Sequence, residues 1–109
     1  MNPLANSLVS RAYNLIRDPK GWTQLTAARD HLSRAVSPRS PEAQKFCGFG
    51  ALARAAHERN LSEQSLAEIF PMPVLTRLIE MNDREGHAAV LDYLERLARE
   101  AAGGFGLDL

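Results

Sequence analysis

The stretch from Ser40 to Asn60, SPEAQKFCGFGALARAAHERN, constrains the fold of this chain more than any other. It begins with the residue types of a helix start: Ser40 as N-cap, Pro41 in the first helical position and Glu42 in the first turn. It ends at Asn60, a residue type that tolerates the left-handed conformation found after helix ends. We therefore predict a central helix over residues 41–59.

Both sides of this predicted helix are apolar. At about 100° per residue, one face carries mainly large side chains (Phe46, Phe49, Leu52, Ala53 and Ala56) and the other carries small ones (Ala43, Cys47, Gly48, Gly50, Ala51 and Ala55). A glycine inside a helix costs about 1 kcal/mol relative to alanine, so Gly48 and Gly50 need a compensating gain. Close approach of another backbone, or of a ligand, would supply that gain. We expect a helix that is buried on two sides.

Length and composition indicate one soluble globular domain over residues 1–109, with 45% hydrophobic and 24% charged residues. The formal net charge of zero argues against a general nucleic-acid binder and against binding to acidic membranes. One cysteine excludes an intrachain disulfide, and with three scattered histidines it forms no typical zinc spacing, so we predict no metal and no cofactor. The sequence shows no secretory signal and no membrane-length apolar run, which predicts a cytoplasmic protein.

Helical periodicity predicts four further helices around the central one, and hence a mainly α, compact bundle of about five helices. They run from Pro3, after an Asn2 cap, to about Arg17, from Ser62 to Phe70, from about Val74 to Met81, and from about His87 to Ala102. We predict that Asn82–Gly86 is a polar loop, that Gly103 and Gly104 end the last helix, and that residues 102–109 form a tail that docks or frays.

The segment 22–37 has two interpretations. Trp22, Leu25, Ala28, Leu32 and Ala35 fit one helical face, and periodicity slightly favours this helix. The alternative is a short hairpin with strands over 23–29 and 34–37 that turns at 30–33. The sequence leaves both open.

Cys47 is the candidate nucleophile. A catalytic cysteine needs a lowered pKa and a base within reach. In a helix that starts at Pro41, Cys47 lies about two turns from the N-terminus, where the helix dipole has mostly faded. His57 is too far along the same helix to serve as its base. The sequence therefore favours a buried packing residue over a nucleophile.

Trp22 and the pair Asn82-Asp83 are candidate ligand-binding residues. A polar pair between two apolar helices could contact a ligand, although turn formation and helix capping explain it more simply. Trp22 could line a site, although lone tryptophans are more often core anchors whose indole N–H is satisfied.

Residues 61–80, LSEQSLAEIFPMPVLTRLIE, offer a helix-turn-helix alternative. Against it stand a turn made of Pro71-Met72-Pro73 with no glycine, a tight spacing, and Arg77 as the one evident contact to base or phosphate. DNA binding is therefore the weakest of the alternatives.

Several short motifs together resemble those of a family of small uncharacterised proteins from bacteria, notably actinobacteria, and their phages. The motifs are G-W-T-Q at 21–24, A-R-D at 28–30, V-S-P-R-S-P-E-A at 36–43, F-C-G-F-G-A-L at 46–52 and N-D at 82–83. The family is a domain of unknown function, so the resemblance implies no activity. It does emphasise Gln24 alongside Trp22, Cys47, Gly50 and Asn82-Asp83. The glycine turn expected after A-R-D is replaced by Leu32-Ser33, which counts against the hairpin.

These observations favour a small non-enzymatic binding or protein-interaction module of mobile-element origin. The first alternative is a cysteine-dependent enzyme that uses Cys47, and the second is the DNA binder through residues 61–80. We expect a protein or small-molecule partner, neither nucleic acid nor a membrane, and leave a homo-oligomer open.

Overall fold

The computed structural model describes residues 3–103, and side chains as far as residue 100. The expected cap at Asn2 and most of the expected tail at 102–109 lie outside these residues. The elements are α1 (Pro3–Ile16), η1 (Pro19–Gly21), β1 (Ala28–Arg29), β2 (Ala35–Val36), β3 (Lys45–Phe46), α2 (Gly48–Glu58), α3 (Glu63–Ile69), α4 (Met72–Arg84) and α5 (His87–Gly103). The predicted mainly α fold with five α-helices is confirmed.

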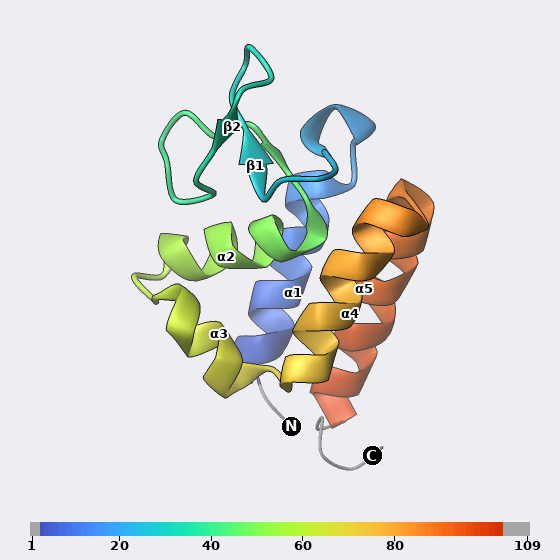
Figure 1. Cartoon of the computed structure of the whole chain (residues 1–109). Coiled ribbons are helices and arrows are strands. Elements are labelled where there is room, and N and C mark those ends of the chain that lie inside the picture. Colours follow the sequence, from blue (N-terminus) through green and yellow to red (C-terminus); the bar gives the residue numbers. More distant parts are fainter. Residues whose placement is uncertain (1–2, 104–109) are drawn as a thin grey trace.

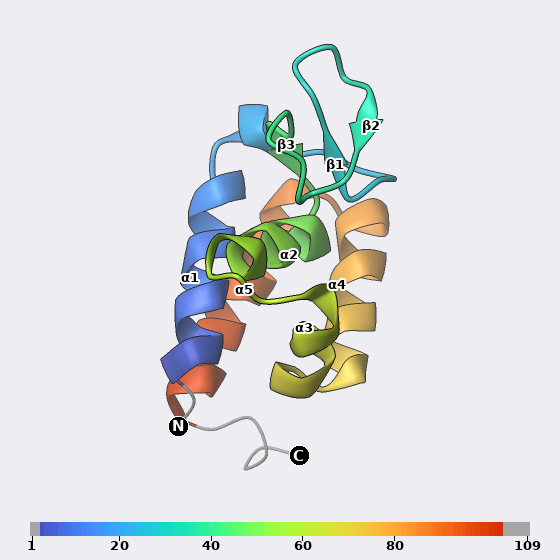
Figure 2. The same ribbon diagram turned by 90° about the vertical axis from the view of Figure 1, so that its left-hand side faces the viewer.

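The helices form a bundle, and the small sheet lies at one end of it (Figure 1). α1 packs most extensively against α5 and α2, and α2 also contacts α3 and α4. Figure 2 views α2 nearly along its axis, between α1 and α4. Seven of the eleven residues of α2 are buried. The predicted central, two-sided burial of this helix is confirmed.

The predicted start of the central helix is wrong, because α2 begins at Gly48 and not at Pro41. Ser40 does bond to the backbone locally, since its hydroxyl accepts from the Glu42 N–H, but the chain continues as turns. β3 then pairs antiparallel with β1, and Phe46 becomes 4% exposed. The Arg54 side chain holds the preceding connector by donating to the carbonyl of Ser40 at 2.7 Å. Strand pairing and burial thus override a local helix-start signal.

The two glycines of α2 allow close packing. A Cβ on Gly50 would lie 1.9 Å from the carbonyl oxygen of Ala27, and one on Gly48 would lie 2.7 Å from a methyl group of Val90 and 2.8 Å from one of Leu78. Of the two reasons predicted for these glycines, close approach of another backbone is confirmed at Gly50.

Residues 22–37 contain the hairpin, and the favoured helix is wrong. Ala28 pairs with Val36, and Arg29 pairs with Ala35. The turn is built by Asp30, which is 2% exposed and whose carboxylate accepts from the N–H groups of Leu32 and Arg34 and from the Arg34 guanidinium. Ser33 takes a φ of 63°, so it adopts the conformation for which a glycine was expected. Side-chain hydrogen bonds of one aspartate therefore replace the glycine.

The later helices follow the sequence closely, with one difference that bears on the site. Ser62 caps α3 as predicted, with its hydroxyl accepting from the Ser65 N–H. α4, however, continues to Arg84, so Asn82 and Asp83 lie in its last turn and the predicted polar loop is wrong. Their side chains are held by tertiary hydrogen bonds, which allow the helix to extend past Met81.

Candidate functional site

Asn82 is the centre of a buried hydrogen-bond network between α4, α2 and the segment before β1. Its side chain is fully buried. Its Oδ1 accepts from the Trp22 indole N–H at 2.7 Å and from the Gly48 N–H at 2.9 Å. Its Nδ2 donates to the Thr23 carbonyl at 3.0 Å and to the Asp83 carboxylate at 3.2 Å. The amide thus makes four bonds within the protein, so a ligand at Asn82 would have to displace one of them.

Gln24 and Asp83 extend this network to the surface. The Gln24 amide donates to the Asn82 carbonyl at 3.1 Å, which satisfies one of the free carbonyls at the end of α4. The Asp83 carboxylate accepts from the Leu25 N–H at 2.9 Å. The four predicted ligand-binding residues, Trp22, Gln24, Asn82 and Asp83, are therefore brought together, and they hold the 22–25 segment against the end of α4.

Trp22 is also supported from the side of α5. The Trp22 and His87 rings lie 5.1 Å apart and are tilted by 46°. His87 Nε2 donates to the Ile16 carbonyl at 2.6 Å, which links α5 to the end of α1. These contacts fit an anchor with a satisfied indole N–H, the simpler of the two interpretations of Trp22.

Cys47 lies at the N-cap of α2, not two turns into it, so the expected position is wrong. Its Sγ accepts from the Gly50 N–H at 3.2 Å. The residue is 7% exposed, and this burial raises the pKa of its thiol. The Asp83 carboxylate also raises this pKa, while the hydrogen bond from the Gly50 N–H lowers it. The thiol therefore stays protonated near neutral pH. Within residues 3–103, no group of three His, Cys, Asp or Glu residues could hold a metal ion.

Two hollows adjoin beside this network, and we call them together the α4 groove. The first hollow has a volume of about 170 Å³ and is lined by Leu25, Thr26, Ala27, Cys47 and Asp83. The second has a volume of about 320 Å³ and is lined by Glu63, Gln64, Ala67, Met72, Leu75 and Thr76. Phe49 and Ile79 line both hollows. Of the described residues, four large hydrophobics are exposed, and three of these line the groove: Leu25 at 78%, Met72 at 58% and Ile79 at 42%. The fourth, Leu32, lies in the hairpin turn.

Leu25 has a strained backbone as well as an exposed side chain. Its φ is 69°, in the left-handed region that costs a residue with a Cβ roughly 1–2 kcal/mol. The bond from its N–H to Asp83 holds it there. The strain thus presents a leucine side chain at the rim of the groove instead of adding it to the core.

Sequence reasoning did not find the α4 groove. A usable signal was present, because Met72, Thr76, Ile79 and Asp83 follow at spacings of four, three and four residues, which places them on one helical stripe. Leu78 and Met81 belong to the buried stripe of the same helix. The sequence alone does not tell which of the two stripes faces the core.

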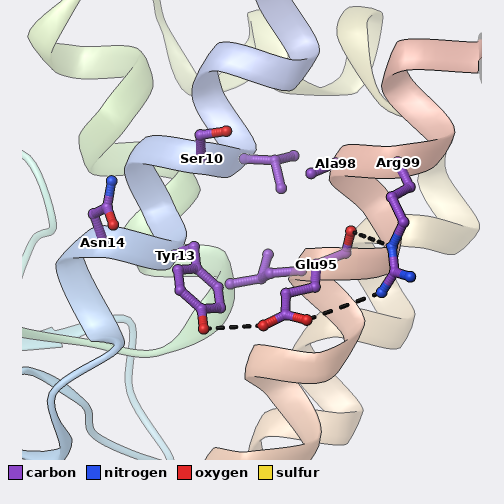
Figure 3. Close-up of a pocket in the computed structure, with 8 residues that line it drawn as sticks. Ser10, Tyr13, Asn14, Glu95, Ala98 and Arg99 are labelled. Atoms are coloured by element: carbon purple, nitrogen blue, oxygen red, sulfur yellow. Dashed lines mark hydrogen bonds and ion pairs between the residues drawn. The ribbon is translucent and has the colours of Figure 1, made fainter.

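A third hollow, of about 540 Å³, lies between α1 and α5 (Figure 3). Three of its polar side chains interact: the Tyr13 hydroxyl donates to the Glu95 carboxylate at 3.0 Å, which raises the pKa of Tyr13, and Arg99 lies 3.9 Å from the same carboxylate. Its apolar floor is made by Val9, Leu94 and Ala98. These contacts fasten α1 to α5 and leave an open surface depression.

Comparison with known proteins places the chain in a family. A family model, described as a family of unknown function (DUF6197), matches residues 2–100. The chain belongs to this DUF6197 family. The match covers every residue of the Asn82 network and of the α4 groove. No curated protein and no solved structure matches the chain.

The motifs predicted a resemblance to a family of unknown function. That part of the prediction is confirmed, because this chain belongs to the DUF6197 family. Within the described residues, none of the helices combines the length and the apolar character that crossing a membrane requires.

Proposed function

We propose that this protein is a non-enzymatic protein-interaction module whose partner binds in the α4 groove. The observation that carries the proposal is the gathering of Leu25, Met72 and Ile79 along one groove. Exposed apolar patches with polar rims are typical of interaction sites on soluble proteins. Glu63, Gln64 and Asp83 supply such a rim.

The conformation of Leu25 supports the same function. A strained residue persists only where the surrounding structure fixes it, and such residues concentrate at binding and switch sites. The Asp83 carboxylate provides that fixation. The Asn82 network, on this proposal, serves as the rigid support of the groove and does not itself contact the partner.

The cysteine-enzyme alternative receives less support from the geometry. A nucleophile needs a thiolate and a base within hydrogen-bond reach. Burial and the Asp83 carboxylate both raise the pKa of the Cys47 thiol. The His87 side chain bonds to the Ile16 carbonyl. These contacts support capping and packing as the role of Cys47.

DNA binding through residues 61–80 also receives less support. α4 would be the recognition helix, and its exposed stripe carries Met72, Thr76 and Ile79. Arg77, the expected phosphate contact, is paired with Glu85 at 3.0 Å. An apolar groove with carboxylates on its rim does not suit a phosphate backbone.

The proposal is tested by selecting peptides from a random display library on the wild-type protein. Selected peptides are expected to bind wild-type protein and a Leu32→Asp control but to lose binding to Ile79→Asp, since both replaced side chains are exposed and only Ile79 lines the groove. Failure to enrich any peptide, or peptides that bind Ile79→Asp as well as wild type, would overturn the proposal. The mobile-element origin stays a prediction that this selection does not address.

A further inference from the structure

We infer that the partner of the α4 groove is a short amphipathic α-helix with an apolar stripe and with lysine or arginine near each end. This inference rests on the proposed function and specifies the chemistry of the partner. Three properties of the groove carry it, namely its length, its walls and its charge.

The length of the groove fits about three helical turns. The exposed stripe of α4 runs from Met72 to Asp83, and eleven residues at a helical rise of about 1.5 Å per residue span about 16 Å. A partner helix of about 12 residues has the same length. Apolar side chains of the partner helix, spaced three and four residues apart, would enter the two hollows on either side of Phe49 and Ile79.

The walls of the groove favour a helix over an extended strand. A strand partner needs a row of free backbone N–H and C=O groups along a sheet edge. The groove is instead walled mainly by side chains of α3 and α4. On the β1 side, the Ala27 carbonyl already accepts from the Cys47 N–H at 3.1 Å. Side chains that enter apolar hollows are the mode of recognition of an amphipathic helix.

The charge of the groove selects a basic partner. Its lining residues include two carboxylates and no Lys, Arg or His. Glu63, in the first turn of α3, borders the second hollow, and Asp83, in the last turn of α4, borders the first. The two negative charges thus lie in different hollows, which share Phe49 and Ile79. A cation near each end of the partner helix would complement them, and an acidic helix would be repelled.

The test uses two labelled synthetic peptides of 14 residues, measured by fluorescence anisotropy at low salt. One has leucines at positions i, i+4, i+7 and i+11 with lysines near both ends, and the other has glutamate in place of every lysine. We expect the lysine peptide to bind wild-type protein about 10-fold more tightly than the glutamate peptide. Ile79→Asp should abolish binding, and Met72→Asp, at a more exposed position, provides a second groove variant should Ile79→Asp fail to fold.

The charge contribution is isolated on α3. Glu63→Lys leaves one positive and one negative charge in the groove, so it should abolish the preference between the two peptides, while Glu68→Lys, at an exposed position of the same helix and outside the groove, should leave it unchanged. If both peptides bind wild-type protein equally and Ile79→Asp abolishes this binding, the inference is overturned and the proposed function is left intact. Binding of neither peptide would also overturn the inference, and the display selection would then decide the proposed function separately. If the protein self-associates without any peptide and Ile79→Asp abolishes this self-association, the groove binds a second copy of the chain, and the inference is overturned as well.

Discussion

At the scale of single residues, Asn82 is the side chain on which the geometry of the site most depends. It satisfies the indole N–H of Trp22 and the N–H of Gly48, the first residue of α2. Loss of a partner leaves a buried donor or acceptor unsatisfied, at about 1–3 kcal/mol each. A single amide therefore joins three parts of the chain that are distant in sequence.

We predict that Asn82→Ala lowers the free energy of unfolding by roughly 2–4 kcal/mol, because it leaves several buried groups without partners. Urea denaturation followed by circular dichroism measures this loss. Asn14→Ala, which removes the same side chain at an exposed position, is the matched control and should change stability by less than about 0.5 kcal/mol. A loss below about 1 kcal/mol for Asn82→Ala would show that the network is not needed for folding.

Leu25 is expected to show a trade-off between stability and binding. Leu25→Gly removes the cost of the left-handed conformation, so the free energy of unfolding should rise by about 0.5–1 kcal/mol. The same change should weaken binding of the lysine peptide, because the apolar contact at the rim is lost. Leu25→Ala keeps the strain and removes the contact, so it should weaken binding without the gain in stability. Unchanged binding in both variants would remove Leu25 from the groove.

Cys47 should react slowly in the folded protein. Burial and the Asp83 carboxylate raise the pKa of its thiol, so the thiolate fraction at a given pH is lower than in the unfolded chain. We predict that iodoacetamide at pH 8 alkylates native protein about 100-fold more slowly than urea-unfolded protein. Equal rates in the two states would instead support a reactive cysteine.

At the scale of elements, α2 is positioned by its glycines as much as by its large side chains. The Ala27 carbonyl oxygen lies 1.9 Å from the position that a Cβ of Gly50 would take, so the N-terminal turn of α2 contacts the segment before β1 directly. This contact fixes the first hollow of the groove, because Ala27 and Cys47 both line it.

Gly50→Ala should therefore be strongly destabilising, by about 3 kcal/mol or more, since rigid backbone and not a flexible side chain would have to move. Gly48→Ala, whose new methyl group meets the side chains of Leu78 and Val90, should cost less, about 1–3 kcal/mol. Thermal denaturation of the two variants compares them. A milder effect at Gly50 than at Gly48 would contradict the close backbone packing at Gly50.

Sequence reasoning predicted elements well where local signals and tertiary packing agree. The Ser62 cap and the proline stop after Phe70 are local features, and the structure keeps the helix that they predict. It failed where distant contacts outweigh local preference. Strand pairing replaced the helix start at Pro41, and the hydrogen bonds of Asp30 built a turn without glycine.

The candidate site was predicted in part for a similar reason. The sequence emphasised Trp22, Gln24, Asn82 and Asp83, and these residues do converge. Their residue types did not reveal that they bond mainly to one another. The exposed stripe of Met72 and Ile79 resembles a core stripe in sequence, because helical spacing is the same for a face that packs inside and a face that binds a partner.

At the scale of the whole molecule, the structure offers two surfaces of different character. The α1–α5 hollow is the larger, and Tyr13, Glu95 and Arg99 interact with one another in it (Figure 3). The α4 groove is smaller and holds three of the four exposed large hydrophobics of the described residues. We therefore assign binding to the α4 groove and a structural role to the α1–α5 hollow.

The most direct test is a titration of ¹⁵N-labelled protein with the unlabelled lysine peptide, followed by two-dimensional NMR. We predict that the largest chemical-shift changes fall on groove residues, including Leu25, Phe49, Thr76 and Ile79, while Tyr13 and Glu95 of the α1–α5 hollow stay unchanged. Changes confined to the α1–α5 hollow, or no changes at peptide concentrations that saturate the anisotropy signal, would contradict the assignment of the α4 groove as the binding site.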